Sequence, residues 1–312
     1  MPEKTAFLFP GQGSQFVGMG RDMLDQFPAA KDIFGEVDEI CGRPISRLCF
    51  EGPMDELTLT ENLQPAITAV NLACLAALNN SGVGPAVSAG HSLGEYAALA
   101  SSGVVSSYDA LRLAQKRGAL MHREALANPG GMAAIIGMDI DAVQTIVDLA
   151  GDKDILSVAN HNTAEQIVIT GEKRPLSRAI QLVKEKKGRA VPLKVSGAWH
   201  SDLMKGAVNE FRRFMEDIPF SRPEFPVLFN ATAKSETDPE SIKDIMAMQL
   251  VNPVKWYDII VNMLNDGIEL FVEVGPKKVL TGLLKKILPQ GKDVGVYNVE
   301  DTQGLGLFLK ES

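Results

Sequence analysis

The fold is decided by the stretch AVSAGHSLGEYAALAS, residues 86–101. Residues 86–90 are small and apolar and predict a buried strand, and residues 95–101 predict a helix. Between them lies Gly90-His91-Ser92-Leu93-Gly94, which has the form G-x-S-x-G. A strand that turns sharply into a helix at this pattern leaves the serine hydroxyl exposed, beside the positive dipole end of the helix. The stretch predicts an α/β protein with Ser92 as a candidate nucleophile; the plain alternative is an ordinary turn with a capping serine.

Strands alternate with helices on both sides of this turn, which favours a largely parallel sheet. We expect further strands at 5–9, 227–230, 269–274 and 294–298. We expect helices at 65–78, 107–127, 239–250, 254–264 and 277–288, and one that begins at 202. These elements predict a large α/β-hydrolase-like domain made of residues 1–128 and 197–312.

Residues 129–196 follow a different pattern, which predicts a small inserted subdomain. Strands are expected at 132–137, 155–160, 166–171 and 189–195, and helices at 139–150 and 172–187. The resulting order, β-α-β-β-α-β, is that of the ferredoxin-like split unit. The turn-forming residues 128–131 mark the entry to the subdomain, and residues 196–197 mark its exit.

The composition of the chain excludes several classes of protein. It has 312 residues, 45% hydrophobic and 22% charged, with 31 Lys and Arg against 39 Asp and Glu. A net charge of −8 disfavours nucleic-acid binding. The apolar run at 5–9 is too short for a signal segment, and no stretch could span a membrane. Three cysteines without a CxxC pair suggest reduced thiols, so we expect a cytoplasmic protein with no metal and no cofactor.

A serine nucleophile needs a base, and the chain has four histidines. His200 ends a loop just before the helix that begins at residue 202, where α/β enzymes place catalytic groups, and is the best candidate. His91 is expected to point away from the line of attack. The plain interpretation of His122 is a solvent-facing helix position, and that of His161 is a hairpin loop.

Arg117 gives a first indication of the substrate. On the helix at 107–127 it falls within an apolar stripe at i+3 and i+4 spacing, whereas Arg112, Lys116 and Arg123 lie on the polar face. An arginine that faces inward must meet an anion, because an unpaired buried charge costs several kcal/mol. Its planar fork suits a carboxylate. The anion is an acid group of the substrate or, alternatively, an internal Asp or Glu.

At these residues the chain resembles the malonyl-CoA:acyl carrier protein transacylase family, the acyltransferases of fatty-acid and polyketide synthesis. The motifs that carry the resemblance run in order along nearly the whole chain: Phe9-Pro-Gly-Gln-Gly-Ser-Gln15, Gly90-His-Ser-Leu-Gly-Glu-Tyr96, Gln115-Lys-Arg-Gly118, Asn160-His-Asn162, Trp199-His-Ser201, Gln249-Leu-Val-Asn-Pro-Val254 and Val272-Glu-Val-Gly-Pro276. The resemblance implies malonyl-CoA and acyl carrier protein as partners and a protein that is commonly monomeric.

The resemblance also implies catalytic roles. Ser92 is the residue that becomes acylated and His200 is its base, oriented by the backbone carbonyl of Gln249 rather than by an acid. The backbone amides of Gln12 and Leu93 form the oxyanion hole.

Further residues are implied to bind the substrate. Arg117 holds the free malonyl carboxylate, and His91, Asn160 and Asn162 belong to the substrate site. Trp199 precedes the catalytic histidine, where the fatty-acid enzymes often have smaller residues. A bulky indole there predicts selectivity for malonyl over methylmalonyl.

Because CoA and carrier proteins are anionic, local cations are expected to steer them. The candidates are the basic run 184–189 and the lysine pairs 277–278 and 285–286. Three alternatives stay open: an α/β-hydrolase-type esterase or thioesterase with an acid behind its histidine, a non-catalytic scaffold that docks carrier proteins, and a transferase that loads a polyketide carrier protein.

Overall fold

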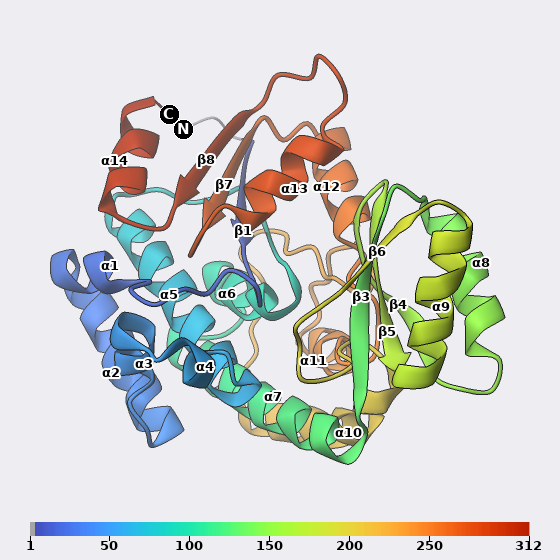
Figure 1. Cartoon of the computed structure of the whole chain (residues 1–312). Coiled ribbons are helices and arrows are strands. Elements are labelled where there is room, and N and C mark those ends of the chain that lie inside the picture. Colours follow the sequence, from blue (N-terminus) through green and yellow to red (C-terminus); the bar gives the residue numbers. More distant parts are fainter. Residues whose placement is uncertain (1–3, 312) are drawn as a thin grey trace.

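The computed structural model describes residues 4–311 and contains two separate sheets (Figure 1). Residues 1–3 and 312, the ends of the predicted large domain, lie outside the described residues. The first sheet has the order β2-β1-β7-β8, and every neighbouring pair is parallel. Its strands are β1 (Thr5–Phe9), β2 (Val87–Gly90), β7 (Leu270–Val274) and β8 (Gly295–Val299). The predicted parallel sheet is confirmed.

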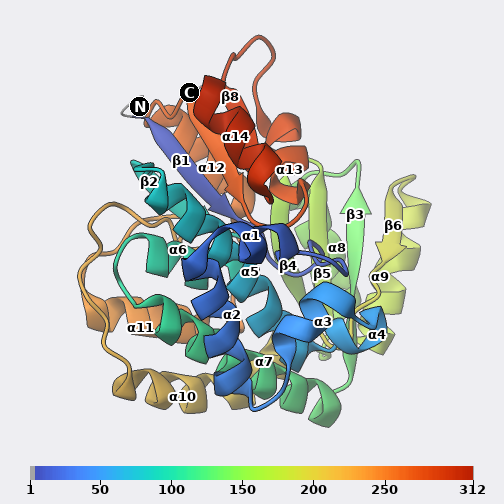
Figure 2. The same cartoon turned by 90° about the vertical axis from the view of Figure 1, so that its left-hand side faces the viewer.

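Helices cover both faces of the parallel sheet, so its central strands are apolar without alternation. In β1, Phe7 and Phe9 pack into the core formed with α2, α5 and α7, and Ala6 and Leu8 pack on the opposite side against α12 and α13 (Figure 2). The helices of this unit are α1 (Arg21–Gln26), α2 (Pro28–Cys41), α3 (Ile45–Glu51), α4 (Met54–Leu57), α5 (Thr60–Asn80), α6 (Glu95–Ser101), α7 (Ser107–Ala127), α10 (Lys205–Phe214), α11 (Pro239–Met248), α12 (Trp256–Asn265), α13 (Val279–Ile287) and α14 (Thr302–Glu311).

Helix α5 begins at Thr60, before the predicted start at Pro65. A proline inside a helix has no N–H for the carbonyl four residues earlier, here that of Glu61. Arg43 fills that vacancy, because its Nη2 donates to the Glu61 carbonyl oxygen at 2.8 Å. A long-range contact therefore allows the helix to run through the proline.

The predicted strand at 227–230 is wrong. Val227 makes only a single parallel bridge to Ser88 of β2. The Ser88 amide donates to Pro226, and the Leu228 amide donates to Ser88. The chain then leaves the sheet edge, because the side chain of Asn230 bonds to Gly90 at the end of β2 and its backbone amide bonds to Glu95 of α6. The helix expected from residue 202 is likewise divided into a 3-10 turn, η2 (Asp202–Met204), followed by α10.

The second sheet is antiparallel, with the order β4-β5-β3-β6. Along the chain its unit consists of β3 (Gly130–Ile136), α8 (Ile140–Gly151), β4 (Leu156–Thr163), β5 (Gln166–Glu172), α9 (Lys173–Glu185) and β6 (Arg189–Pro192). Helices α8 and α9 cover one face. From the other face Met132, Ala134 and Val168 join the core of the larger unit, so the two units pack side by side (Figure 1). No helix within residues 4–311 is long and apolar enough to cross a membrane.

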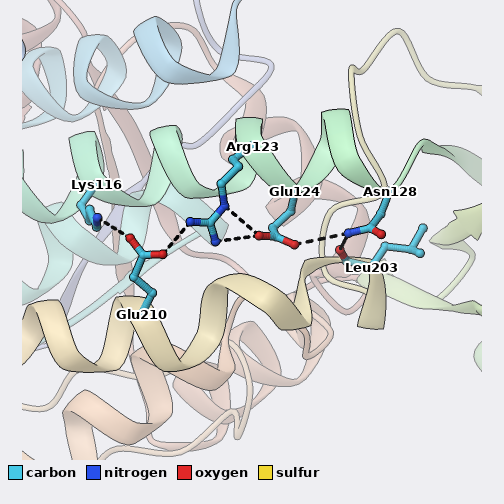
Figure 3. A network of polar contacts seen from close by, with 6 residues as sticks. All are labelled: Lys116, Arg123, Glu124, Asn128, Leu203 and Glu210. Atoms are coloured by element: carbon cyan, nitrogen blue, oxygen red, sulfur yellow. Dashed lines mark hydrogen bonds and ion pairs between the residues drawn. The ribbon is translucent and has the colours of Figure 1, made fainter.

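A chain of ionic contacts fixes α7 against α10 and η2 (Figure 3). Glu210 accepts from Lys116 and Arg123, and Arg123 in turn pairs with Glu124. Asn128 closes the chain by donating to Glu124 and to the carbonyl of Leu203 in η2. Since α7 carries Arg117 and η2 directly follows His200, the network holds together the two elements that present these side chains.

Candidate active site

The turn at Ser92 is as sharp as the sequence predicts. Ser92 begins a 3-10 turn, η1 (Ser92–Gly94), with a φ of 51°, a left-handed conformation that is rare for a residue with a side chain. Both flanking glycines are required by close packing. A Cβ at Gly90 would lie 1.9 Å from the carbonyl carbon of Gly94, and one at Gly94 would lie 2.0 Å from the carbonyl oxygen of Phe9.

Asn230 clamps this turn from behind, and sequence reasoning missed it. Its Oδ1 accepts from the Ser92 amide at 2.6 Å, and its Nδ2 donates to the Gly90 carbonyl at 2.7 Å. The side chain is fully buried. One amide therefore satisfies a donor and an acceptor that the tight turn leaves without helical partners. The signal in the sequence that could have found it is an asparagine at the end of an apolar run, after the prolines at 219, 223 and 226.

Ser92 and His200 come together across 108 positions of the sequence. Ser92 Oγ lies 2.8 Å from His200 Nε2, and His200 Nδ1 lies 2.9 Å from the Gln249 carbonyl and 3.1 Å from that of Asn252. Carbonyl oxygens only accept, so Nδ1 carries the proton and Nε2 is left to accept from the serine hydroxyl. His200 is thus poised as a base, and Asn252 is a second orienting carbonyl that the sequence analysis did not name.

Burial keeps His200 neutral. Its side chain is 3% exposed, and this desolvation, aided by the positive charge of Arg117, lowers the pKa of His200 to about 3. The Gln249 and Asn252 carbonyls at Nδ1 oppose this lowering of the pKa, but they are neutral and do not overcome the desolvation. An esterase triad requires an acid at Nδ1 of its histidine. Among the described residues, the carbonyls of Gln249 and Asn252 lie at that atom instead.

Arg117 is buried, as its place in the apolar stripe predicts, with 1% exposure. Nη1 donates to Gln64 Oε1 at 2.8 Å, and Nη2 donates to Gln249 Oε1 at 2.9 Å and to Ser92 Oγ at 3.1 Å. Its guanidinium also lies 5.8 Å from the centre of the Tyr96 ring. Neutral oxygens hold the fork, so the guanidinium is oriented toward the nucleophile without a bonded counter-charge.

A pocket of about 110 Å³ opens above the Ser92–His200 pair. The larger unit contributes Gln12, Leu93 and Arg117 to its wall, together with Met121, Trp199 and other residues, and the smaller unit contributes Met132, Asn160 and Leu193. The pocket therefore lies where the two units meet. Gln12 and Leu93, whose backbone amides are the expected oxyanion hole, both line this pocket.

The three other histidines differ in their position relative to this pocket. His91 lines it, and its Nε2 lies 2.8 Å from Asn162 Oδ1, while burial lowers the pKa of His91. His122 is half-buried and does not line the pocket. The interpretation of His161 as a loop residue is wrong: it lies in β4, and its ring packs 4.8 Å from that of Tyr257.

A family model described as acyl transferase domain matches residues 6–310. This chain belongs to the acyl transferase family. A malonyl CoA-acyl carrier protein transacylase of Bacillus subtilis is 41% identical over 310 residues, which cover 99% of this chain and 98% of that protein. A protein of Haemophilus influenzae with the same name is 37% identical and covers 98% of this chain and 99% of its own length.

Solved structures agree with the family assignment. An acyl carrier protein S-malonyltransferase of Vibrio cholerae superposes with a TM-score of 0.93 at 39% identity, covering 98% of this acyl transferase and 99% of that chain. A type II PKS acyl-carrier protein in complex with its malonyl-transacylase gives 0.94 at 36% identity, with coverage of 99% and 100%. The resemblance seen in the motifs is confirmed over nearly the full length of the acyl transferase.

Proposed function

We propose that this acyl transferase moves a malonyl group from malonyl-CoA to the phosphopantetheine thiol of an acyl carrier protein. The observation that carries the proposal is the position of Arg117, whose Nη2 lies 3.1 Å from the hydroxyl that also contacts His200. A buried cation beside a nucleophile selects an acyl group that carries its own carboxylate. The relatives described above are named as malonyl transferases, which supports the same substrate.

The first half of the reaction acylates Ser92. His200 Nε2 accepts the hydroxyl proton as Oγ forms a bond to the thioester carbon of malonyl-CoA. The amides of Gln12 and Leu93 donate to the oxygen that becomes negative, and each such donor contributes about 3 kcal/mol. The carbon–sulfur bond breaks, the imidazolium returns its proton to the CoA sulfur, and a malonyl-serine ester remains.

The second half runs in reverse. The carrier thiol gives its proton to His200 and attacks the ester carbon, and Ser92 Oγ leaves and regains a proton from the imidazolium. Arg117 pairs with the malonyl carboxylate in both halves. His91 and Asn160 line the acyl side of the site, and Asn162 holds His91. A carboxyl-free acyl group leaves the guanidinium unpaired and is disfavoured.

The anionic carrier protein docks near the pocket mouth, guided by lysines. Lys277 is exposed, and its Nζ lies 3.4 Å from the carbonyl of Gly13, next to Gln12 in the pocket wall. Lys286 reaches from α13 to Gln166 of the smaller unit at 3.3 Å. The Lys277 contact favours the pair 277–278, and the Lys286 contact places the pair 285–286 where the two units meet.

The proposal includes the finer organisation of the molecule. We infer an α/β-hydrolase-like domain of residues 1–128 and 197–312 and a ferredoxin-like subdomain of residues 129–196, supported by the element order and by the sheet order β4-β5-β3-β6. We further propose a monomer of the cytoplasm. A scaffold without catalysis is disfavoured because it has no need of the contacts among Ser92, His200 and Arg117.

Intact-protein mass spectrometry tests the proposal. The protein is mixed separately with malonyl-CoA, acetyl-CoA and methylmalonyl-CoA, and the covalent adduct is mapped. We expect a malonyl adduct on Ser92 that Ser92→Ala abolishes and that the neighbouring Ser101→Ala, on α6, leaves unchanged. Rapid hydrolysis of malonyl-CoA without a thiol acceptor would instead support an esterase or thioesterase. Transfer to a panel of carrier proteins separates fatty-acid from polyketide partners.

A further inference from the structure

Glu95 is a fully buried carboxyl at the first position of α6, and the reaction outlined above does not use it. Both of its oxygens accept a hydrogen bond. The amide of Asn230 donates to Oε1 at 2.6 Å, and the side-chain Nε2 of Gln249 donates to Oε2. Burial raises the pKa of the Glu95 carboxyl, and the two donors and Arg117 oppose that rise. A buried carboxyl is costly, so its presence calls for a role.

The two donors to Glu95 are the residues that hold the reacting groups. Asn230 Oδ1 accepts from the Ser92 amide at 2.6 Å. Gln249 contacts all three reacting residues: Nε2 donates to the Ser92 carbonyl at 2.9 Å, Oε1 accepts from Arg117 Nη2 at 2.9 Å, and its carbonyl lies 2.9 Å from His200 Nδ1. Glu95 therefore bonds directly to the two residues, Asn230 and Gln249, that hold the nucleophile, the base and the cation.

We propose that Glu95 is a positioning residue for acyl transfer, which orients Ser92 through Asn230 and orients Arg117 and His200 through Gln249. The inference rests on the proposed function and deepens it. By accepting from Nε2, the carboxylate fixes which way the Gln249 amide faces, and Oε1 of that amide is then left to hold Arg117. A reversed amide would turn its NH2 group toward the guanidinium, and the fork would lose its orientation.

A carboxylate suits this place because two N–H donors point at it. Glutamine at position 95 has the same shape, but its NH2 group must face either the Asn230 amide or Gln249 Nε2, which leaves one donor without an acceptor. The electrostatic interaction between the two groups also matters. In its ionised form Glu95 opposes the lowering of the Arg117 pKa that burial causes.

Glu95→Gln tests the proposal through the rate at which malonyl-CoA acylates Ser92. Small displacements of reacting groups cost up to about 100-fold, so we expect a 10- to 100-fold fall in kcat/KM. The preference for malonyl-CoA over acetyl-CoA should fall as well, because Arg117 loses its orientation. A residue that only stabilises the fold would leave that preference unchanged.

The matched control is Glu273→Gln. Glu273 is also buried, at 1% exposure, and also accepts from two amides, those of Leu280 and Thr281 at 2.9 and 2.7 Å, but it does not line the pocket. We expect it to lower the melting temperature with little effect on the malonyl preference. Equal effects of the two substitutions on the preference would overturn the proposal.

A double-mutant cycle isolates the path through Gln249. Gln249→Ala removes the side chain but keeps the carbonyl that His200 contacts. If Glu95 orients Arg117 through that side chain, Glu95→Gln causes no further fall in the malonyl preference in the Gln249→Ala background, whereas its effect on the acylation rate through Asn230 persists. A fall in the preference that multiplies independently in the double variant would contradict the proposal.

Two further arms keep the test decisive. If Glu95→Gln does not fold, Glu95→Asp replaces it, because the shorter acid keeps the charge but cannot reach both donors. The same fall in rate and preference is expected, and wild-type behaviour would refute the role. Failure of the proposed function is seen separately, since wild-type protein would then form no malonyl-serine at all.

Discussion

Arg117 and Ser92 lie in direct contact, with Nη2 donating at 3.1 Å to the same Oγ that lies 2.8 Å from His200 Nε2. We therefore expect the fork to meet the far carboxylate of a malonyl group, a three-carbon diacid unit, when its other carbonyl is bonded to Ser92. The same contact occupies a lone pair of the hydroxyl oxygen, so its proton is directed to His200.

Arg117→Ala should reverse the acyl preference. Truncating one partner of a buried charge pair costs about 2–5 kcal/mol, or roughly 30- to 5,000-fold in kcat/KM for malonyl-CoA. The acetyl group of acetyl-CoA has no carboxylate for Arg117 to bind, so the rate of acetyl transfer should fall far less. Steady-state rates with both thioesters measure the effect, and Arg112→Ala on the outer face of α7 serves as the control. An unchanged malonyl-to-acetyl ratio would remove Arg117 from the substrate site.

His200 should stay an effective base in mild acid. Its pKa is held at about 3, far below the ordinary 6.5, so the imidazole is still neutral at pH 5. Because the folded-state pKa is depressed, the unfolded chain takes up a proton first as the pH falls. The free energy of unfolding should therefore decrease between pH 6.5 and about 3.

The rate of Ser92 acylation against pH checks this expectation. The acid limb should lie well below pH 6.5, and Arg117→Ala, measured with acetyl-CoA, should move it upward because a neighbouring positive charge is gone. A limb centred near 6.5 in the wild type would show that His200 is solvated during turnover.

Trp199 should limit branched substrates. The indole is 5% exposed, lines the pocket and packs against Gly197. Trp199→Leu frees room beside the acyl group while keeping an apolar side chain. One methyl group is worth about 1–3 kcal/mol in such a pocket, so methylmalonyl transfer relative to malonyl should rise roughly 10-fold or more. Equal wild-type rates with the two thioesters would reject the steric explanation.

Gly11→Ala should damage the oxyanion site. A Cβ at Gly11 would lie 2.3 Å from the carbonyl oxygen of His91, so the loop that carries Gln12 must move. Losing one oxyanion donor lowers kcat by about 100- to 1,000-fold, with KM little changed. Gly35→Ala on α2, where a Cβ meets nothing within 4 Å, is the control. Full activity of Gly11→Ala would exclude the Gln12 amide.

Lys277→Glu should weaken the carrier protein selectively. Reversing a charge at the pocket mouth should raise the KM for carrier protein several-fold at low salt, and the effect should shrink as salt screens it. Malonyl-CoA acylation without carrier protein is the internal comparison, and Lys31→Glu on α2 is the matched surface control. The double substitution Lys186→Glu with Lys187→Glu tests the other basic run, and an unchanged KM there would remove it from the docking surface.

Much of the fold could be predicted because the signals are local. Strand β1 spans the predicted residues 5–9, and α6 spans 95–101. Helix α7 spans the predicted residues 107–127, and Ser106 caps it with Oγ accepting from the Asp109 amide at 3.0 Å. The failures at Pro65 and at 227–230 have a different cause. Arg43 supports α5 across Pro65 by bonding to the Glu61 carbonyl, and Asn230 draws the chain at 227–230 toward the turn at Ser92. Both contacts join residues far apart in the sequence, so no local pattern reveals them.

The sequence by itself determined the alternation of strands and helices, the glycine-flanked turn at Ser92 and the inward face of Arg117, since each depends on neighbours a few residues away. Only the tertiary structure decided how these parts meet. His200, Gln249 and Asn230 reach Ser92 or Arg117 from distant segments, and hydrogen bonds of this kind follow from packing the parallel sheet, its helices and the inserted unit together. Local periodicity carries no information about such distances, because it reports only which side of an element is apolar.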